Sequence, residues 1–402
     1  MVGQSTDRAS RATEDTGLER WASTRLTYLD NLKVVLIATI IALHGILGYT
    51  GTLEVWTYTE LREVTLNPAV EVTLLVFVSP FGFFLIALLF LVAGLLTPTS
   101  HDRKGTRRFV LDRLLRLGVP FVAYVFVVQP VATYAVEHPL GDAPGSFWQE
   151  YLGAERQIDT GPLWFVGVLL IFSLGYAAWR HWGRPTGGRH AGTLRLARPV
   201  TLRTLVLLAA VVAPSSFLVR LVYPYGSEAG FSDLNLWEWP ACLAVFGTGV
   251  VAARQGWLES VPADVARRSR TVTLVAVAGM TALLAVAGAT DSAEDAFGGW
   301  HWLGVVFVVI EAMLTVFGSV WLLSVAQHRL RRHHRFGPAL SRSAHAAFML
   351  QTVFLLALAM ALRPIDVPAE VKALLVAAGG IVTSFGAAWL LITKVPGLSR
   401  VL

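Results

Sequence analysis

A lysine and a histidine lie eleven positions apart in the first apolar stretch of the chain. The segment begins Tyr28-Leu29-Asp30-Asn31-Leu32-Lys33, continues with ten mostly apolar residues and ends at His44-Gly45. Eleven helical steps complete about three turns, so Lys33 and His44 share one helix face about 16 Å apart, and Asp30 lies on the same stripe. Ionisable side chains are costly inside lipid, and where they occur they usually serve a function.

The chemistry that suits His44 is general base catalysis. An imidazole titrates near neutrality, so it can take a proton from a hydroxyl and return it to a leaving group. The alternative is a structural histidine that binds a backbone carbonyl or lines a water cavity. Asp30 and Lys33 on the same stripe favour the functional interpretation. We therefore predict Asp30 as a second catalytic residue and Lys33 as a substrate-binding residue. Both are too far from His44 to touch it and would act on another part of the site.

Two arginines lie three residues apart in Arg113-Leu114-Leu115-Arg116, just before the third apolar stretch. At a helix start, side chains with this spacing project together. Two guanidinium groups suit phosphate, which arginine binds with two parallel hydrogen bonds. The alternative is topological, because basic residues commonly flank the cytoplasmic ends of membrane helices. We predict Arg113 and Arg116 as substrate-binding residues.

Three further polar or aromatic side chains fall where lipid or its interface is expected. Arg220 lies near the outer end of the fifth stretch and Glu311 lies inside the eighth. They are predicted to bind substrate or to form a structural ion pair. Trp164 opens the fourth stretch, either as a platform for a sugar ring or as an interfacial anchor. The pair His333-His334 lies in a basic loop without further ligand spacing, so no metal site is expected.

These residues must be positioned by membrane helices. Of 402 residues, 54% are hydrophobic and 15% are charged, and the mean hydropathy is +0.58, which is typical of a polytopic membrane protein. We predict an all-α fold with ten spans. The spans are expected near 32–50, 71–96, 117–136, 162–181, 203–223, 236–253, 271–290, 302–326, 340–362 and 371–392.

The charges indicate how these spans are oriented. Ten spans place both termini on one side, and most of the 33 Lys and Arg residues fall on that side, whereas the opposite loops are rich in acids. The positive-inside rule then predicts cytoplasmic termini in the plasma membrane. The same asymmetry explains the net charge of +6 through contact with anionic lipid headgroups. No basic domain with interleaved aromatic residues suggests nucleic acid as a partner.

The domain organisation is simple. Residues 1–25 are polar and lack an apolar core for a signal peptide, so we expect a disordered cytoplasmic tail. Residues 26–402 are expected to form one membrane-embedded domain. Cys242 is the only cysteine, which excludes intrachain disulfides and thiolate metal sites.

Taken in order, these segments resemble acyltransferase family 3, the integral-membrane acyltransferases that modify carbohydrates and other cell-envelope acceptors. Within the family, the resemblance is to the glucan biosynthesis protein C-like branch. It covers nearly the whole chain. The motifs are Leu29-Asp30-Asn31-Leu32-Lys33 with His44, Phe83-Phe84 to Ala93-Gly94-Leu95, Arg113 to Phe121, Gly161-Pro162-Leu163-Trp164-Phe165, Phe246-Gly247-Thr248-Gly249 with Arg254-Gln255-Gly256-Trp257, and Pro396 to Leu402.

The resemblance implies transfer of an acyl group, typically acetyl, from cytoplasmic acyl-CoA to a hydroxyl of a carbohydrate, glycolipid or other acceptor at the outer face. No permanently bound cofactor is implied. His44 matches the catalytic histidine of the family, Lys33 its basic partner, and Arg113 and Arg116 its paired arginines. The ninth span departs from the pattern. The family often has an apolar-His pair there, whereas this chain has Ala344-His345 and Leu350-Gln351.

Physics and resemblance suggest one mechanism. The CoA phosphates would lie among Arg113, Arg116 and Lys33, and the pantetheine arm, about 15–20 Å long, matches the helical rise from Lys33 to His44. His44 would deprotonate the acceptor for direct attack or carry the acyl group transiently. A transporter or flippase is the competing class, although no inverted repeat is recognisable. A catalytically inactive scaffold is a third interpretation.

Overall fold

The computed structural model describes residues 27–52, 62–140, 146–151, 159–183, 200–227, 234–255, 257 and 260–398. The tail predicted over residues 1–25 lies outside these residues. The described part of the chain is all-α and holds ten helices long and apolar enough to cross a membrane. The predicted fold class and the predicted number of spans are therefore confirmed.

The spanning segments in chain order are the first helix (Thr27–Leu47), α3 (Pro68–Thr73) continuing into α4 (Ser79–Lys104), α5 (Thr106–Arg113) continuing through α6 (Val119–Ala123) into α7 (Gln129–Leu140), α9 (Trp164–Trp182), α10 (Leu202–Arg220), α11 (Trp239–Arg254), α12 (Ala263–Ala289), α14 (Trp302–Met313) continuing into α15 (Ser319–Arg329), α16 (Gly337–Leu362) and α17 (Ala369–Lys394). Two short helices, α8 (Phe147–Tyr151) and α13 (Ala293–Phe297), lie between spans.

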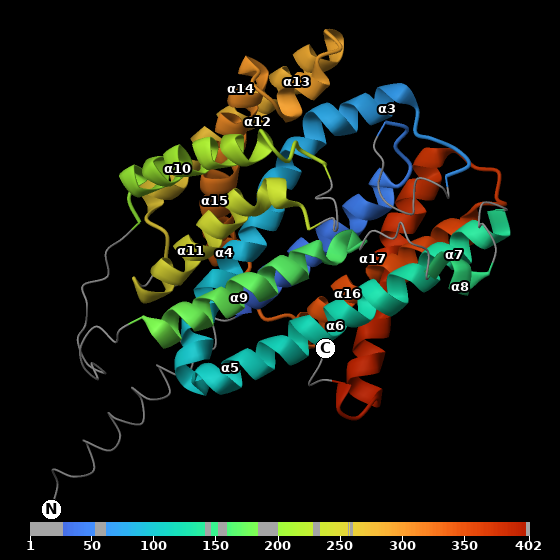
Figure 1. Ribbon diagram of the computed structural model, residues 1–402, viewed down its shortest axis with the longest axis horizontal. Helices are drawn as coiled ribbons and strands as arrows, with labels where there is room; N and C mark the ends of the chain where they lie inside the picture. The colour runs from blue at the N-terminus through green and yellow to red at the C-terminus, as the bar shows by residue number, and fades with distance from the viewer. Residues whose placement is uncertain are drawn as a thin grey trace, which may run out of the picture.

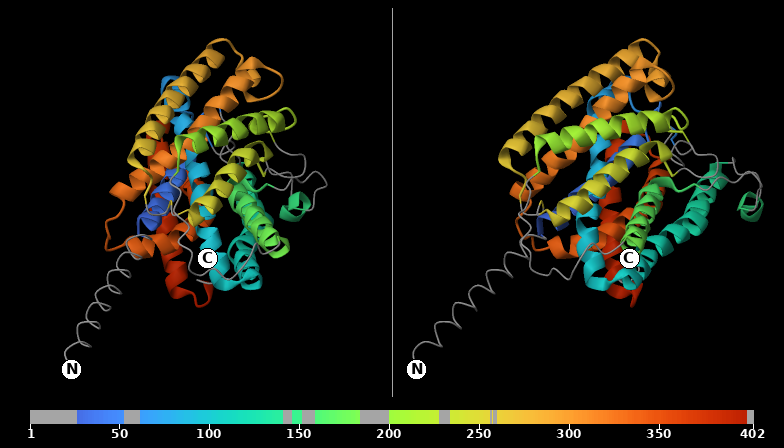
Figure 2. Two further views of the ribbon diagram at one scale, coloured as in Figure 1. Left: turned by 90° about the vertical axis from the view of Figure 1, so that its left-hand side faces the viewer. Right: turned by 60° about the vertical axis from the view of Figure 1, so that its left-hand side comes forward.

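These helices form one bundle, with α12 along one edge and α7 along another (Figures 1 and 2). Among the helices from α3 to α17, α4 packs most extensively on α11, and α16 on α17. The first helix packs closely on α17, because a side chain at Gly45 would reach the Ala377 backbone at 2.9 Å. The residue after His44 therefore has to be small. The eighth span, α14 with α15, is the most enclosed of the ten.

In the part of the chain that the structure describes, four π-helical segments interrupt the spans: Leu74–Val78, Leu114–Gly118, Tyr124–Val128 and Leu314–Gly318. A π-segment leaves backbone groups without their regular helical partners and often occurs at functional sites. In the second span, the carbonyl of Val76 accepts a hydrogen bond from the Thr281 hydroxyl of α12 at 2.8 Å. This bond compensates for part of the irregular ladder.

We call the side of the bundle on which the first helix begins the proximal side, and the side on which it ends the distal side. Because the spans alternate in direction, the proximal side also holds the end of α4, the start of α5 and the ends of α9 and α11. The distal side holds the start of α3 and the starts of α9 and α11. The predicted site residues divide between the two sides.

Candidate functional site

A cavity of about 330 Å³ lies in the distal half of the bundle. The end of the first helix, the second span and the starts of α9 and α11 enclose it. Its walls are mainly apolar and aromatic, which is typical of small-molecule sites. Its lining includes His44, Phe83, Trp164, Tyr225, Asn235, Trp237 and Glu238, together with aliphatic residues of the first two spans.

His44 is held from behind by a side chain of the ninth span. Its Nδ1 lies 3.0 Å from Oε1 of Gln351, which is fully buried in α16. An amide oxygen only accepts hydrogen bonds, so Nδ1–H is the donor and Nε2 carries the lone pair that a general base uses. The glutamine that departs from the family pattern is thus the residue that orients the predicted base.

Trp164 lines the same cavity and is only 8% exposed. Its side chain is therefore part of the cavity wall, and its use as a platform for a sugar ring stays a prediction. Its position follows from the turn Gly161–Leu163, which precedes α9. Gly161 has a positive φ of 44°, and a side chain there would meet the Tyr124 hydroxyl at 2.9 Å.

A chain of hydrogen bonds fixes this turn. The Tyr124 hydroxyl bonds to Oε1 of Gln129 at 2.7 Å and to the Thr352 hydroxyl at 2.8 Å. The Gln129 amide donates to the Asp159 carboxylate, which also accepts the Gly161 N–H at 2.8 Å. Because Thr352 follows Gln351 on α16, one turn of this helix positions both His44 and the start of α9.

Arg220 and Glu311, whose contact the sequence left open, form a buried ion pair with an Nη2–Oε1 distance of 2.7 Å. The guanidinium lies 5.2–5.6 Å from the ring centroids of Tyr225, Trp237 and Phe307. Tyr225 and Trp237 also form part of the cavity wall. Burial raises the pKa of the Tyr225 phenol well above its usual value, with the nearby acids adding to the shift. The ion pair therefore supports the wall from behind.

Glu238 is a cavity residue that the sequence analysis did not single out. It is 9% exposed, lines the cavity and lies within electrostatic reach of Arg220 and Glu311. Within the described residues, its carboxyl group makes no hydrogen bond. An acid at the end of a span resembles the many other acids of the distal loops, so spacing alone could not distinguish it. The cavity thus presents a carboxyl group in addition to an imidazole.

The predicted cations gather on the proximal side. His345 of α16 lies within electrostatic reach of Arg116, Arg113 and Lys33, and its Nε2 is 3.0 Å from the Arg116 carbonyl. Lys33 is paired with Asp30 at 2.8 Å. The three cations predicted to bind substrate are therefore brought together around a histidine whose role the sequence left open.

The two arginines do not project as a simple fork. The helix of the third span begins at Thr106 rather than near 117, so both lie within the span, and Arg116 falls in the π-segment Leu114–Gly118. Arg113 stacks over the ring of Phe109 at 5.0 Å, whereas Arg116 pairs with Asp112 at 3.2 Å. The two guanidinium groups contribute to one charged region from separate anchors.

Asp30 is separated from His44. The two residues lie on one unbroken helix, fourteen positions and about 21 Å apart. The Asp30 carboxylate binds Lys33, so it does not reach the atoms that His44 would act on. This contact is that of a partner that positions Lys33, and the catalytic role expected from the sequence stays a prediction.

Comparison with known proteins identifies the family. A family model described as an acyltransferase domain, that of the acyltransferase 3 family, matches residues 26–393. No curated protein matches the chain. No solved structure matches it either. A family match over nearly the whole chain, together with ten membrane-spanning helices, shows that the chain belongs to the acyltransferase 3 family and is an integral-membrane acyltransferase.

Proposed function

We propose that this acyltransferase moves an acetyl group from cytoplasmic acetyl-CoA to a hydroxyl of a carbohydrate or other cell-envelope acceptor. The observation that carries the proposal is the first helix. It is unbroken from Thr27 to Leu47, with Lys33 in the proximal cation cluster and His44 in the distal cavity, about 16 Å apart. A CoA thioester extended along this distance reaches His44 while its phosphates remain on the proximal side.

The donor is assigned to the proximal side by its charge. Lys33, Arg113 and Arg116 gather there, and guanidinium groups bind phosphate oxygens with charge-assisted hydrogen bonds. The diphosphate of CoA is the matching ligand. Asp30 would hold the Lys33 ammonium in position, and Asp112 the Arg116 guanidinium. With the proximal side in the cytoplasm, the cluster faces the compartment that holds acyl-CoA.

The acceptor is assigned to the distal cavity by its lining. Trp164 and Trp237 offer aromatic faces, on which the apolar face of a sugar ring stacks. Asn235 and Glu238 offer polar atoms that bind hydroxyl groups. All four residues line the cavity that contains His44. A ring with one apolar face and several hydroxyl groups matches this combination of walls.

The chemistry then follows from the His44 tautomer. Nε2 removes the proton of the acceptor hydroxyl while the hydroxyl oxygen attacks the thioester carbonyl carbon. The new C–O bond forms, the C–S bond breaks, and the imidazolium returns the proton to the departing sulfur. Gln351 keeps Nδ1–H bonded throughout and so holds the ring in place. In the two-step variant, Nε2 carries the acyl group before the acceptor attacks.

The test is turnover of radiolabelled acetyl-CoA by membranes that express the full chain. We expect His44→Ala to lose about 10²–10⁴-fold in rate while still binding CoA, because general base assistance contributes about this much. The double variant Arg113→Ala/Arg116→Ala should instead bind CoA more weakly. His334→Ala, which alters an exposed histidine outside both sites, is the control.

Turnover by His44→Ala at the rate of the wild type would contradict the base mechanism. Labelled CoA that binds the wild type without any acyl transfer to membrane components or to water would point to a different acyl chain. Absence of CoA binding to the wild type would contradict the proposed donor.

A further inference from the structure

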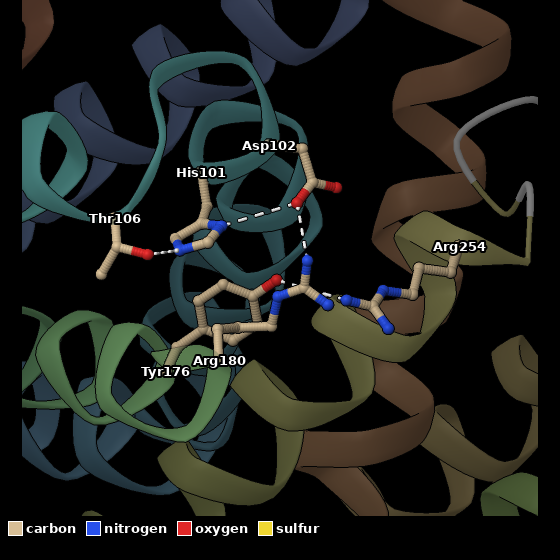
Figure 3. Close-up of polar contacts among 6 residues, drawn as sticks. All are labelled: His101, Asp102, Thr106, Tyr176, Arg180 and Arg254. Carbon is tan, nitrogen blue, oxygen red and sulfur yellow. Dashed lines mark hydrogen bonds and ion pairs between the residues drawn. The ribbon is translucent and has the colours of Figure 1, made fainter. Parts of the chain in front are cut away.

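A second group of charged side chains lies on the proximal side, outside the sites described above. Figure 3 shows its six residues, which come from four spans. His101 and Asp102 lie near the end of α4, Tyr176 and Arg180 near the end of α9, and Arg254 ends α11. Thr106 opens α5. No motif spacing in the sequence connects these residues.

The two arginines converge from different helices. Nη2 of Arg180 is 3.0 Å from the Asp102 carboxylate, and Nη2 of Arg254 is 3.5 Å from the Tyr176 hydroxyl. In Figure 3 the two guanidinium groups lie next to each other beside this hydroxyl. We name them the Arg180–Arg254 pair.

The framework around the pair is partly buried and well connected. His101 is 6% exposed, and its ring nitrogens contact the Thr106 hydroxyl at 3.1 Å and the Asp102 carboxylate at 3.5 Å. Its ring also packs edge-on against Tyr176, with centroids 5.5 Å apart. Tyr176, which holds Arg254, is thus anchored in the bundle, whereas Asp102, which holds Arg180, is 56% exposed, and both arginines reach the surface.

The charges of the group do not balance. Two guanidinium groups are always ionised, and the single carboxylate among the six residues, Asp102, is also shared with His101. Like charges that converge repel each other, and an anion placed between them removes the repulsion. Phosphate fits this position because each guanidinium offers several planar donors. The group is thus suited to bind a phosphate from the aqueous phase.

The pair is close to the proposed donor site. Phe109 lies under Arg113, with the guanidinium 5.0 Å from the ring centroid. The same ring packs against His101 at 5.4 Å and against Tyr176 at 6.5 Å between centroids. One layer of aromatic rings thus separates Arg113 from the Arg180–Arg254 pair. Two phosphate sites on one surface suit a ligand that carries phosphates at two separate positions.

We propose that the Arg180–Arg254 pair binds the 3′-phosphate on the ribose of the CoA donor. The inference rests on the proposed function, in which Arg113, Arg116 and Lys33 bind the diphosphate. A phosphate monoester carries a charge of about −1.5 to −2 at pH 7, which offsets the excess positive charge of the pair. An anionic lipid headgroup offers the same phosphate chemistry, and the experiment separates these two sources.

The experiment measures binding of CoA and of 3′-dephospho-CoA to the purified full chain in nanodiscs of phosphatidylcholine. The two ligands differ only in the phosphate of interest. We expect the wild type to bind CoA about 10–100-fold more tightly, because hydrogen bonds between charged groups contribute this range. Arg180→Gln and Arg254→Gln should reduce the preference, and the double variant should bind both ligands alike. Arg267→Gln, at an exposed arginine of α12, should keep the full preference.

Equal binding of both ligands by the wild type would overturn the assignment, and this result needs no variant to fold. A preference that survives in the folded double variant would overturn it as well. Nanodiscs with phosphatidylglycerol test the other source. If the pair binds this lipid instead of CoA, the wild type shows no preference for CoA in either kind of nanodisc, and the double variant retains less phosphatidylglycerol than the wild type. Failure of the wild type to bind either ligand would contradict the proposed donor itself.

Discussion

At the scale of single residues, His44 differs from a histidine oriented by a carboxylate. Its Nδ1–H donates to the neutral amide of Gln351, which fixes the tautomer without adding a charge to a buried position. A charge there would require a partner or solvation. The neutral pair thus fixes His44 in the wall of a cavity that is mainly apolar.

This arrangement predicts the effect of Gln351→Leu. The change removes the acceptor of the Nδ1–H bond and leaves this donor unsatisfied, so the catalytic geometry of His44 is no longer held. We expect acyl transfer to fall by about 10–100-fold, the equivalent of one lost buried hydrogen bond, with CoA binding unchanged. Gln351→Glu keeps an acceptor at the same place and should retain more activity than the leucine variant.

Turnover of labelled acetyl-CoA and binding of CoA, measured on the same preparations, check this prediction. Val353→Leu, at an exposed position of the same helix, is a control for general effects of altering α16. Equal rates in Gln351→Leu and the wild type would show that the amide does not orient the base.

The buried pair of Arg220 and Glu311 predicts a stability effect. Both side chains are about 3% exposed, so Arg220→Met leaves an uncompensated buried carboxylate and should lower the free energy of unfolding by about 3–5 kcal/mol. Arg220→Met combined with Glu311→Met removes both charges and should recover most of this loss. Denaturant unfolding in detergent measures both values. Additive losses in the double variant would contradict a direct pair.

Spacing along one helix identified Lys33 and His44, because residues on one face of one span can be found by counting. Partners from distant spans could not be found in this way. Gln351 is 307 positions from His44, and Glu238 joins the same cavity from the sixth span. The pairing of helices that creates the cavity depends on three-dimensional packing, which the spacing within a span does not encode.

At the scale of elements, the contact between α4 and α11 depends on two glycines, Gly94 of α4 and Gly249 of α11. A Cβ at Gly249 would overlap the Leu91 carbonyl oxygen and lie 2.8 Å from the Leu95 nitrogen. Both neighbours are backbone atoms, so neither can move without displacing the helix. Small residues allow membrane helices to approach this closely. The segment Phe246-Gly247-Thr248-Gly249, noted as a motif in the sequence, thus contains a helix-packing site.

This contact predicts different effects on stability at two nearby glycines of α11. Gly249→Ala should force the helices apart and lower the free energy of unfolding by about 1–3 kcal/mol, the usual cost of overpacking. Gly247→Ala is the matched control, because a side chain there meets nothing within 4 Å. It should be neutral or stabilise by up to about 1 kcal/mol through higher helix propensity. Equal stability of the two variants would argue against close packing at Gly249.

The ten spans were predictable because each carries enough apolar residues to cross the bilayer. The ends of the spans were less predictable. The third helix begins at Thr106, since the basic residues before the apolar part continue the helix into the aqueous region. The four π-segments left no signal in the apolar pattern. Their irregular backbone depends on partners in other helices, as Thr281 shows for Val76.

At the scale of the whole molecule, the two proposed sites lie near opposite ends of the first helix. The cation cluster around His345 and the Arg180–Arg254 pair lie on the proximal side, and the cavity with Trp164 and Glu238 lies in the distal half. A donor and an acceptor from different compartments could therefore meet at His44 without either crossing the whole bilayer. This requires the proximal side to be cytoplasmic.

Labelling of single cysteines tests this orientation. The only natural cysteine, Cys242, is fully buried, so the parent chain should react little with a membrane-impermeant maleimide. Glu294 of α13 and Arg332 between α15 and α16 are exposed and lie on opposite sides of the eighth span. We expect Glu294→Cys to be labelled on intact cells and Arg332→Cys only after the membrane is made permeable, because the basic loops remain cytoplasmic.

The reverse labelling pattern would affect more than topology. It would place Lys33, Arg113 and Arg116 outside the cytoplasm, where acyl-CoA is not supplied. The aromatic cavity would then face the cytoplasm. The donor assignment and the role of the Arg180–Arg254 pair would then fail together, whereas the family membership and the bond between His44 and Gln351 would stand. The labelling experiment therefore decides whether the basic residues that orient the protein also lie on the side of the membrane that supplies acyl-CoA.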